Sequence, residues 1–99
     1  MTYLDKLAAE IQRSISPDLL PQGNTRLLFR LYAVLALAKG RAVSAADVHN
    51  VWAAWVLEQD PAHPSVKPFE QLDVETQASD EPFAQAIRRV AERFGQHLA

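Results

Sequence analysis

Four stretches of the chain carry apolar residues at every third or fourth position, and prolines or glycines separate these stretches. This spacing is typical of amphipathic helices, because residues three and four positions apart lie on one helical face. No stretch of any length shows the alternation of apolar and polar residues that marks a half-buried strand. The spacing therefore predicts an all-α fold, a compact single-domain bundle of four main helices that spans residues 1–99.

The first predicted helix begins at a capping signal and ends at a proline. Thr2 is followed three residues later by Asp5, an acidic variant of the capping box. Pro17 cannot continue a helix, and it disfavours the helical conformation in the residue before it. We therefore expect this helix to end near residues 14–15. The connector that follows contains Leu19 and Leu20, which we expect to hold it to the core.

The second predicted helix has the broadest apolar face in the chain. Asn24 or Thr25 can cap its start, because both side chains carry an oxygen that accepts from the first free backbone N–H groups. Gly40 follows its last apolar residues, where a left-handed C-terminal residue is favoured. A helix with so broad an apolar face must be covered on several sides. We therefore expect it to be the central helix, crossed by the others.

The third predicted helix contains both tryptophans. Ser44 and Asp47 repeat the capping pattern at its start, and Pro61 prevents it from continuing. Its apolar residues fall at helical spacing in a stripe wide enough to be buried. The members of this stripe are Val48, Val51, Trp52, Trp55 and Val56.

The fourth predicted helix is separated from the third by an irregular loop that contains a His-Pro pair. This loop covers residues 62–73, and one short turn is expected at residues 69–72. Ser79 or Asp80 can cap the helix that follows, and Gly95 is expected to end it. The two-tryptophan helix and this loop are the features of the sequence that most invite a functional interpretation.

Composition sets the class of protein but not its activity. The chain is 48% hydrophobic and 22% charged, which is typical of a globular domain. It contains no cysteine, so disulfides and thiolate metal sites are excluded. The amphipathic N-terminal segment does not resemble a signal peptide, and the longest apolar run is too short to cross a membrane. We therefore expect a cytoplasmic protein that does not insert into membranes.

The residues that catalysis or metal binding would need are not arranged for either. The histidines, His49, His63 and His97, do not share the four-residue spacing of a helical zinc site. Ser44 is better explained as a helix cap than as a nucleophile. The glycines do not form a phosphate-binding loop. We therefore expect a protein that is not an enzyme, with no catalytic residues, no metal and no cofactor.

Nucleic acid is an alternative partner, because the second and third helices could form a helix-turn-helix pair. The outer face of the third helix, however, carries no Arg or Lys, although a recognition helix needs polar and basic side chains. The net charge of −2 also gives no general attraction to a phosphate backbone. A small DNA-associated regulator therefore stays an alternative to our preferred interpretation.

Trp52 and Trp55 lie three residues apart, on the same side of the third helix. We interpret Trp52 as a core residue, because it falls at the centre of the apolar stripe and a buried aromatic ring covers a large area. A core of this size has limited room for a second indole. We therefore interpret Trp55 as the tryptophan that is free to contact a ligand or a partner.

Two segments resemble the ryanodine-receptor repeat (RyR) domain family. They are Val48-His49-Asn50-Val51-Trp52 and the run from His63-Pro64 to Leu72. Asp80 matches the aspartate that precedes the next helix of the family, and the resemblance is strongest over residues 48–94. The chain is also similar to small actinobacterial and actinophage proteins of unknown function. The resemblance implies a helical RyR-like domain over residues 1–99, with a binding rather than a catalytic role.

The resemblance also implies a ligand class, but it does not carry over the ligand site. In the receptor, a purine nucleotide lies between aromatic residues of paired repeats. Family members have a G-W-x-Y-G stretch between the first Trp and His-Pro, whereas this chain has ten residues there and none of that motif. The loop also has a structural explanation, in which His63 bonds to a helix end while Val66, Phe69 and Leu72 hold the loop to the core.

Together these observations predict a non-enzymatic binding module. Its partner is expected to be another protein or a flat, nucleotide-like small molecule. The predicted ligand-binding residues are Trp55, His63, His49 and Trp52. A structural homodimer, formed through apolar surface left by the first and third helices, is a further alternative.

Overall fold

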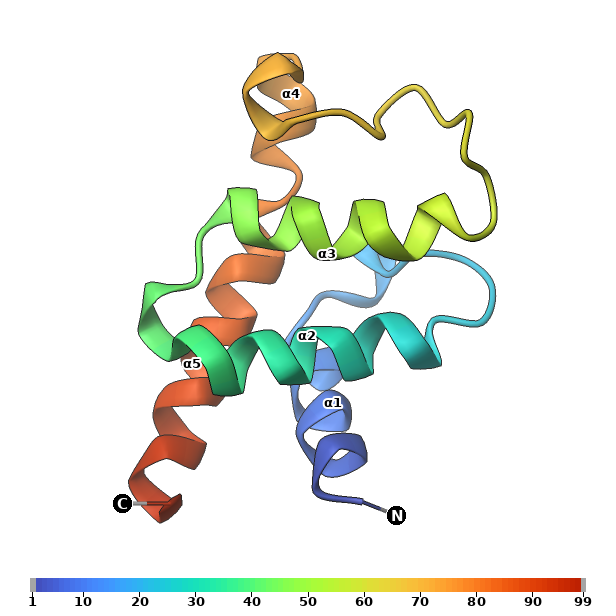
Figure 1. Cartoon of the computed structure of the whole chain (residues 1–99). Helices are drawn as coiled ribbons and strands as arrows, with labels where there is room; N and C mark the ends of the chain where they lie inside the picture. Colours follow the sequence, from blue (N-terminus) through green and yellow to red (C-terminus); the bar gives the residue numbers. More distant parts are fainter. Residues whose placement is uncertain (1, 99) are drawn as a thin grey trace.

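The computed structural model describes the backbone of residues 2–98 and the side chains of residues 2–94. The described residues contain no strand, and their Cα radius of gyration of 13.1 Å is that of a folded domain of about 100 residues. The all-α bundle predicted from the sequence is therefore confirmed (Figure 1). Its four long helices are α1 (Tyr3–Arg13), α2 (Arg26–Lys39), α3 (Ala45–Leu57) and α5 (Glu81–Leu98), with a short α4 (Val74–Ala78) and 3₁₀ turns η1 (Pro17–Leu19), η2 (Gly40–Ala42) and η3 (Phe69–Gln71).

Helix α2 is the central helix, as its broad apolar face predicts. It contacts α1, α3 and α5, and Figure 1 shows α3 running beside it in the opposite direction while α5 crosses both. The side chains that α2 buries are Leu28, Phe29, Tyr32, Ala33 and Ala36. Each of the three neighbouring helices therefore packs against a different part of one apolar surface.

The capping boxes that begin α1 and α3 and the glycine that follows α2 are confirmed, whereas the side chain of Thr25 makes no capping hydrogen bond at the start of α2. Thr2 and Asp5 form a complete capping box at α1, and Ser44 and Asp47 form another at α3. Gly40 has a φ of +55° after the last turn of α2, a conformation that a side chain would strain. These features depend on residues within four positions of one another, so the sequence alone is enough to locate them.

Two features of the C-terminal half differ from the expectation. Helix α5 continues through Gly95 to Leu98, because glycine inside a helix costs only about 1 kcal/mol relative to alanine and does not by itself end it. Helix α4 lies in a segment that we expected to be loop; its Asp73 side chain accepts from the backbone N–H of Thr76. Five residues are too few to show a helical period, so the apolar pattern could not reveal α4. The side chain of His97 lies outside the described residues.

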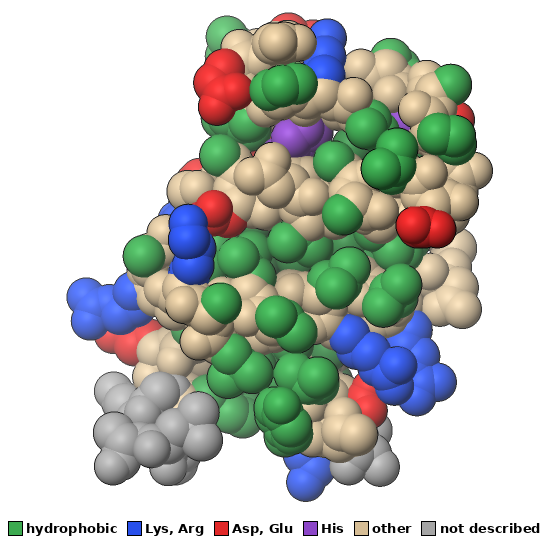
Figure 2. Space-filling view, in the orientation of Figure 1, with side chains coloured by type: hydrophobic (Ala, Val, Ile, Leu, Met, Phe, Trp, Pro, Cys, Tyr) green, Lys and Arg blue, Asp and Glu red, His purple; other side chains and the backbone are tan. Residues whose placement is uncertain are grey.

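Part of α2 faces solvent despite its apolar composition. Leu27, Val34 and Leu37 are each about half exposed, at 54%, 47% and 46%. Figure 2 shows hydrophobic side chains gathered over the middle of this face of the molecule. We expected the exposed apolar surface to lie on the first and third helices. Tyr3 of α1 and Leu57 of α3 are indeed exposed, but more of the exposed large apolar residues lie on α2. None of the described helices is long and apolar enough to cross a membrane.

Candidate functional site

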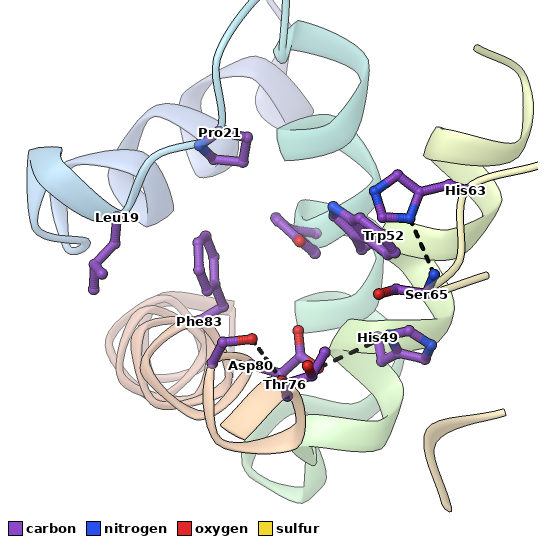
Figure 3. A pocket seen from close by; sticks show the side chains of 11 residues that line it. Leu19, Pro21, His49, Trp52, His63, Ser65, Thr76, Asp80 and Phe83 are labelled. Atoms are coloured by element: carbon purple, nitrogen blue, oxygen red, sulfur yellow. Dashed lines mark hydrogen bonds and ion pairs between the residues drawn. The ribbon is translucent and has the colours of Figure 1, made fainter. Parts of the chain in front are cut away.

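A cavity of about 270 Å³ opens where α3, the His-Pro loop and the start of α5 meet (Figure 3). The connector after α1 closes one side, and Tyr32 of α2 lines it as well. Most of its wall is apolar, but it also receives imidazole, hydroxyl and carboxylate groups. The lining residues are Leu19, Pro21, Tyr32, His49, Trp52, His63, Ser65, Thr76, Ser79, Asp80 and Phe83.

Three rings from α3 and the loop form one wall of the cavity. His49 and Trp52 lie three residues apart on α3, so they share a helical face. Their rings are nearly parallel, at an angle of 27° and a centroid distance of 5.7 Å. His63 meets Trp52 edge to face, with centroids 5.1 Å apart. Trp52 is thus held between two imidazoles, which fixes the orientation of its indole.

His49 ties the His-Pro loop to α3. It is 2% exposed, and its Nε2 lies 2.7 Å from the backbone oxygen of Lys67. A carbonyl oxygen can only accept, so Nε2 must donate and carries a proton. In the neutral ring the Nδ1 atom is then left with a lone pair. The sequence singles out this histidine, but its partner lies 18 residues away and had no local signal.

His63 makes a hydrogen bond within its own loop rather than to a helix end, which corrects the expectation. Its Nδ1 accepts from the backbone N–H of Ser65, 3.1 Å away, across the intervening Pro64. The short His-Pro-Ser turn places both partners at the cavity. Leu72 is buried, and Val66 and Phe69 are half-buried, but none of the three belongs to the hydrophobic core cluster or packs against it, which corrects the expectation. Phe69 lies instead beside His49 of α3, with ring centroids 6.2 Å apart.

Asp80 has a carboxylate whose hydrogen-bonding capacity is not satisfied. Its Oδ2 is buried and has no hydrogen-bond partner among the described residues, and it lies 3.9 Å from Nδ1 of His49. Burial disfavours the charged form and raises the pKa of this carboxyl from 3.8 to about 6, while the nearby His49 acts in the opposite direction. Burial, together with the negative charge of Asp80, also raises the pKa of Tyr32.

Of the two tryptophans, Trp52 and not Trp55 lies at the cavity, which corrects the expectation that Trp55 is the indole free to contact a ligand. Both are half-buried and pack against the core, but Trp52 also lines the cavity and Trp55 is not among the lining residues. The reason is helical geometry: Trp55 is rotated by about 120° around α3 from His49, at about 100° per residue. The position of the cavity relative to α3 decides which indole is accessible, and that position depends on the rest of the fold.

The remaining lining residues have weaker signals in the sequence. Tyr32 is a polar-tipped ring within an aliphatic stripe, and its ring lies 6.0 Å from that of Phe83. Asp80 was interpreted as a helix cap, and nothing local reveals that its carboxylate would face an imidazole. Both are placed at the cavity by contacts between segments far apart in the chain.

The cavity has the chemistry of a binding site for a flat molecule. The half-buried rings of Trp52 and Phe83 can stack against a ligand, while the buried ring of Tyr32 forms part of the cavity wall. The polar groups at its edge can fix the orientation of such a ligand through hydrogen bonds. Among the described residues, no group of three His, Asp or Glu side chains lies close enough together to hold a metal ion.

The comparisons with known proteins identify a family without a stated activity. A model of a domain of unknown function (DUF7701) matches residues 2–92, so the chain belongs to this family. No curated protein and no solved structure matches the chain. The matched range includes every residue that lines the cavity.

Proposed function

We propose that this member of the DUF7701 family is a non-enzymatic binding module that holds a flat, nucleotide-like small molecule in the cavity beside Trp52. The observation that carries this proposal is the combination of ring-lined walls with polar atoms at one edge. A volume of about 270 Å³ lies slightly below the range of typical ligand sites, which begins at about 300 Å³. That size suits one ring system, such as a nucleobase, better than a whole dinucleotide.

Several contacts favour binding over catalysis. The hydroxyl of Ser79 donates to the backbone oxygen of Thr76 at 2.6 Å, so its proton already has a partner. Nδ1 of His63 accepts from the backbone of its own loop. A nucleophile needs a base within hydrogen-bond reach, and these groups serve the local structure instead. The resemblance to the RyR domain supports the same conclusion, and the cysteine-free composition is consistent with a cytoplasmic module.

Intrinsic tryptophan fluorescence tests this proposal. A panel of purine and pyrimidine nucleotides is titrated into the wild type, Trp52→Phe and Trp55→Phe. We expect at least one nucleotide to change the emission of the wild type and of Trp55→Phe, and to leave Trp52→Phe almost unchanged. The matched pair separates the cavity indole from the core indole. If no nucleotide changes either the emission or the melting temperature of the wild type, the small-molecule function is wrong.

A second candidate function is self-association through α2. Leu27 and Val34 lie seven residues apart on one stripe of α2, and both are about half exposed. A helix that presents such a stripe can pack against the same stripe of a second copy about a two-fold axis. Sedimentation of the wild type and of Val34→Lys at increasing concentration tests this candidate. We expect the wild type to dimerise and the variant to stay monomeric; a monomeric wild type at high concentration would exclude it.

A further inference from the structure

Two hydrogen-bond acceptors face each other at one end of the cavity. Oδ2 of Asp80 is buried without a partner, and Nδ1 of His49 lies 3.9 Å from it. Because Nε2 of His49 donates to the backbone oxygen of Lys67, Nδ1 of the neutral ring is an acceptor too. The separation is too long for a hydrogen bond. A buried carboxylate oxygen that lacks a donor is costly. The Asp80 side chain as a whole is 15% exposed and lines the cavity, where a ligand can supply a donor to the carboxylate.

The lysine and arginine side chains of this region do not pair with the carboxylate of Asp80. Arg88 of α5 is already committed, because one of its nitrogens donates to Glu81 at 2.7 Å and another to the backbone oxygen of Val43. Lys67 contributes a backbone oxygen, not its ammonium group, to His49. Among the residues that line the cavity there is no Lys or Arg. A positive charge next to Asp80 would therefore have to come from His49 or from a ligand.

The aromatic walls favour the same kind of ligand. Trp52, Tyr32 and Phe83 line the cavity that Asp80 enters, and Figure 3 shows Phe83 and Trp52 on either side of it. The faces of such rings attract cations as well as flat apolar surfaces. A flat ligand ring that bears a delocalised positive charge can stack against the aromatic rings and pair with the carboxylate at the same time.

We infer that the cavity selects a flat ligand with nitrogen atoms along one edge, where these nitrogens are cationic or act only as hydrogen-bond donors. An amidine or an amino-substituted heterocycle has such an edge. Asp80 is the residue that determines this specificity. This inference rests on the proposed small-molecule function and narrows its ligand class. Asp80 accepts from the N–H groups of the ligand, while the buried Nδ1 of His49 supplies no donor of its own to the carboxylate. Flat ligands whose ring edge presents only acceptors, or a negative charge, to the Asp80 carboxylate are rejected.

Calorimetric titration with three probes of nearly one shape tests the inference at neutral pH. Benzamidine is a flat cation with N–H donors, benzamide is its neutral counterpart, and benzoate is its anionic counterpart. We expect benzamidine to bind about tenfold or more tightly than benzamide, since charge-assisted hydrogen bonds are about twice as strong as neutral ones, and benzoate to give no measurable heat. Asp80→Asn should abolish the preference, so that benzamidine and benzamide bind alike.

The control is Glu75→Gln, which removes one negative charge from an exposed position of α4 and should leave the preference unchanged. Circular dichroism of each variant confirms that the helices are retained. Equal or tighter binding of benzamide or benzoate by the wild type would overturn the inference but leave the small-molecule function intact. A preference for benzamidine that persists in Asp80→Asn would also overturn the inference and leave the small-molecule function intact. If none of the three probes binds and no nucleotide binds, both the inference and the proposed function are wrong.

Discussion

Asp5 and Asp80 each stand at or near the start of a long helix, but their surroundings are opposite. Asp5 accepts from the backbone and hydroxyl of Thr2 and from Nε of Arg30, 2.8 Å away. These bonds hold its pKa well below the ordinary value of 3.8. Asp80 has a buried oxygen without a partner, and its pKa is raised to about 6. The same residue type thus stabilises the fold at one end of the molecule and is left unsatisfied at the other.

The difference separates a region in which charged groups stabilise the fold from the proposed binding site. Between α1 and α2, the chain supplies partners for its own charged groups, because Asp5 and Arg30 bond to each other. Around the cavity, the chain brings polar atoms together and leaves one without a partner. Proteins accept such local costs at binding sites, where a ligand completes the hydrogen bonds. The following changes test that contrast, beginning with the largest expected effect.

Leu28→Ala should produce the largest loss of stability. Leu28 is completely buried on the side of α2 that packs in the core, so its removal loses apolar burial and leaves a cavity. We expect a loss of about 2–5 kcal/mol in the free energy of unfolding, measured by urea denaturation. The matched control is Leu27→Ala, because Leu27 is 54% exposed and should change the free energy by only about 0.5 kcal/mol. Equal losses for the two leucines would contradict the assigned core.

Asp80→Asn should have the opposite sign and stabilise the protein above pH 6. A pKa raised from 3.8 to about 6 means that the folded state disfavours the charged form, at a cost of up to about 3 kcal/mol. Because the side chain is partly open to solvent, we expect a gain of about 1–2 kcal/mol on substitution. The titratable groups that face this carboxyl are His49 of α3 and Tyr32 of α2.

The pH dependence of this gain in stability shows whether the buried charge of Asp80 is its cause. Below about pH 3 the carboxyl is protonated in both the folded and the unfolded chain, so the substitution should have almost no effect. As the pH rises from about 3 to about 6, the unfolded chain loses its proton first and the folded state is progressively destabilised. Urea denaturation of wild type and variant at pH 3 and pH 8 measures this difference. A variant that is less stable than the wild type at pH 8 would show that Asp80 has a structural role.

Asp5→Asn should give the smallest change, and with the reverse dependence on pH. The pKa of Asp5 is lowered in the folded state, so its contribution to stability is present above about pH 4 and is lost as the pH falls below that. The urea midpoint of the wild type should therefore decrease between pH 5 and pH 3 by more than that of the variant. Parallel midpoints over this range would mean that the bonds to Thr2 and Arg30 contribute nothing measurable.

The two regions also differ in how far the sequence reveals them. The capping boxes of α1 and α3 and the positive φ of Gly40 depend on neighbouring residues, so local signals were sufficient to predict them. The continuation of α5 through Gly95 was not predicted, because glycine only weakens a helix and does not forbid it. The central position of α2 followed from its apolar width alone.

The cavity, in contrast, could be predicted only in part. His49, Trp52 and His63 were among the predicted ligand-binding residues, and the structure brings their rings together. The assignment of Trp55 to the site depended on the rotation of α3 relative to the other helices, which no local pattern contains. Asp80 and Tyr32 are 48 positions apart in the chain (80 − 32), so only the packing of α5 on α2 places both at the cavity.

If the cavity beside Trp52 is the binding site, the two indole N–H resonances of the protein report on ligand binding directly. A ¹H–¹⁵N spectrum of the wild type, with Trp52→Phe and Trp55→Phe used for assignment, is recorded during titration with benzamidine and with nucleosides. We expect the Trp52 indole signal to shift with saturation while the Trp55 signal stays in place. A shift confined to Trp55, or no shift of either signal with any of these probes, would contradict this expectation.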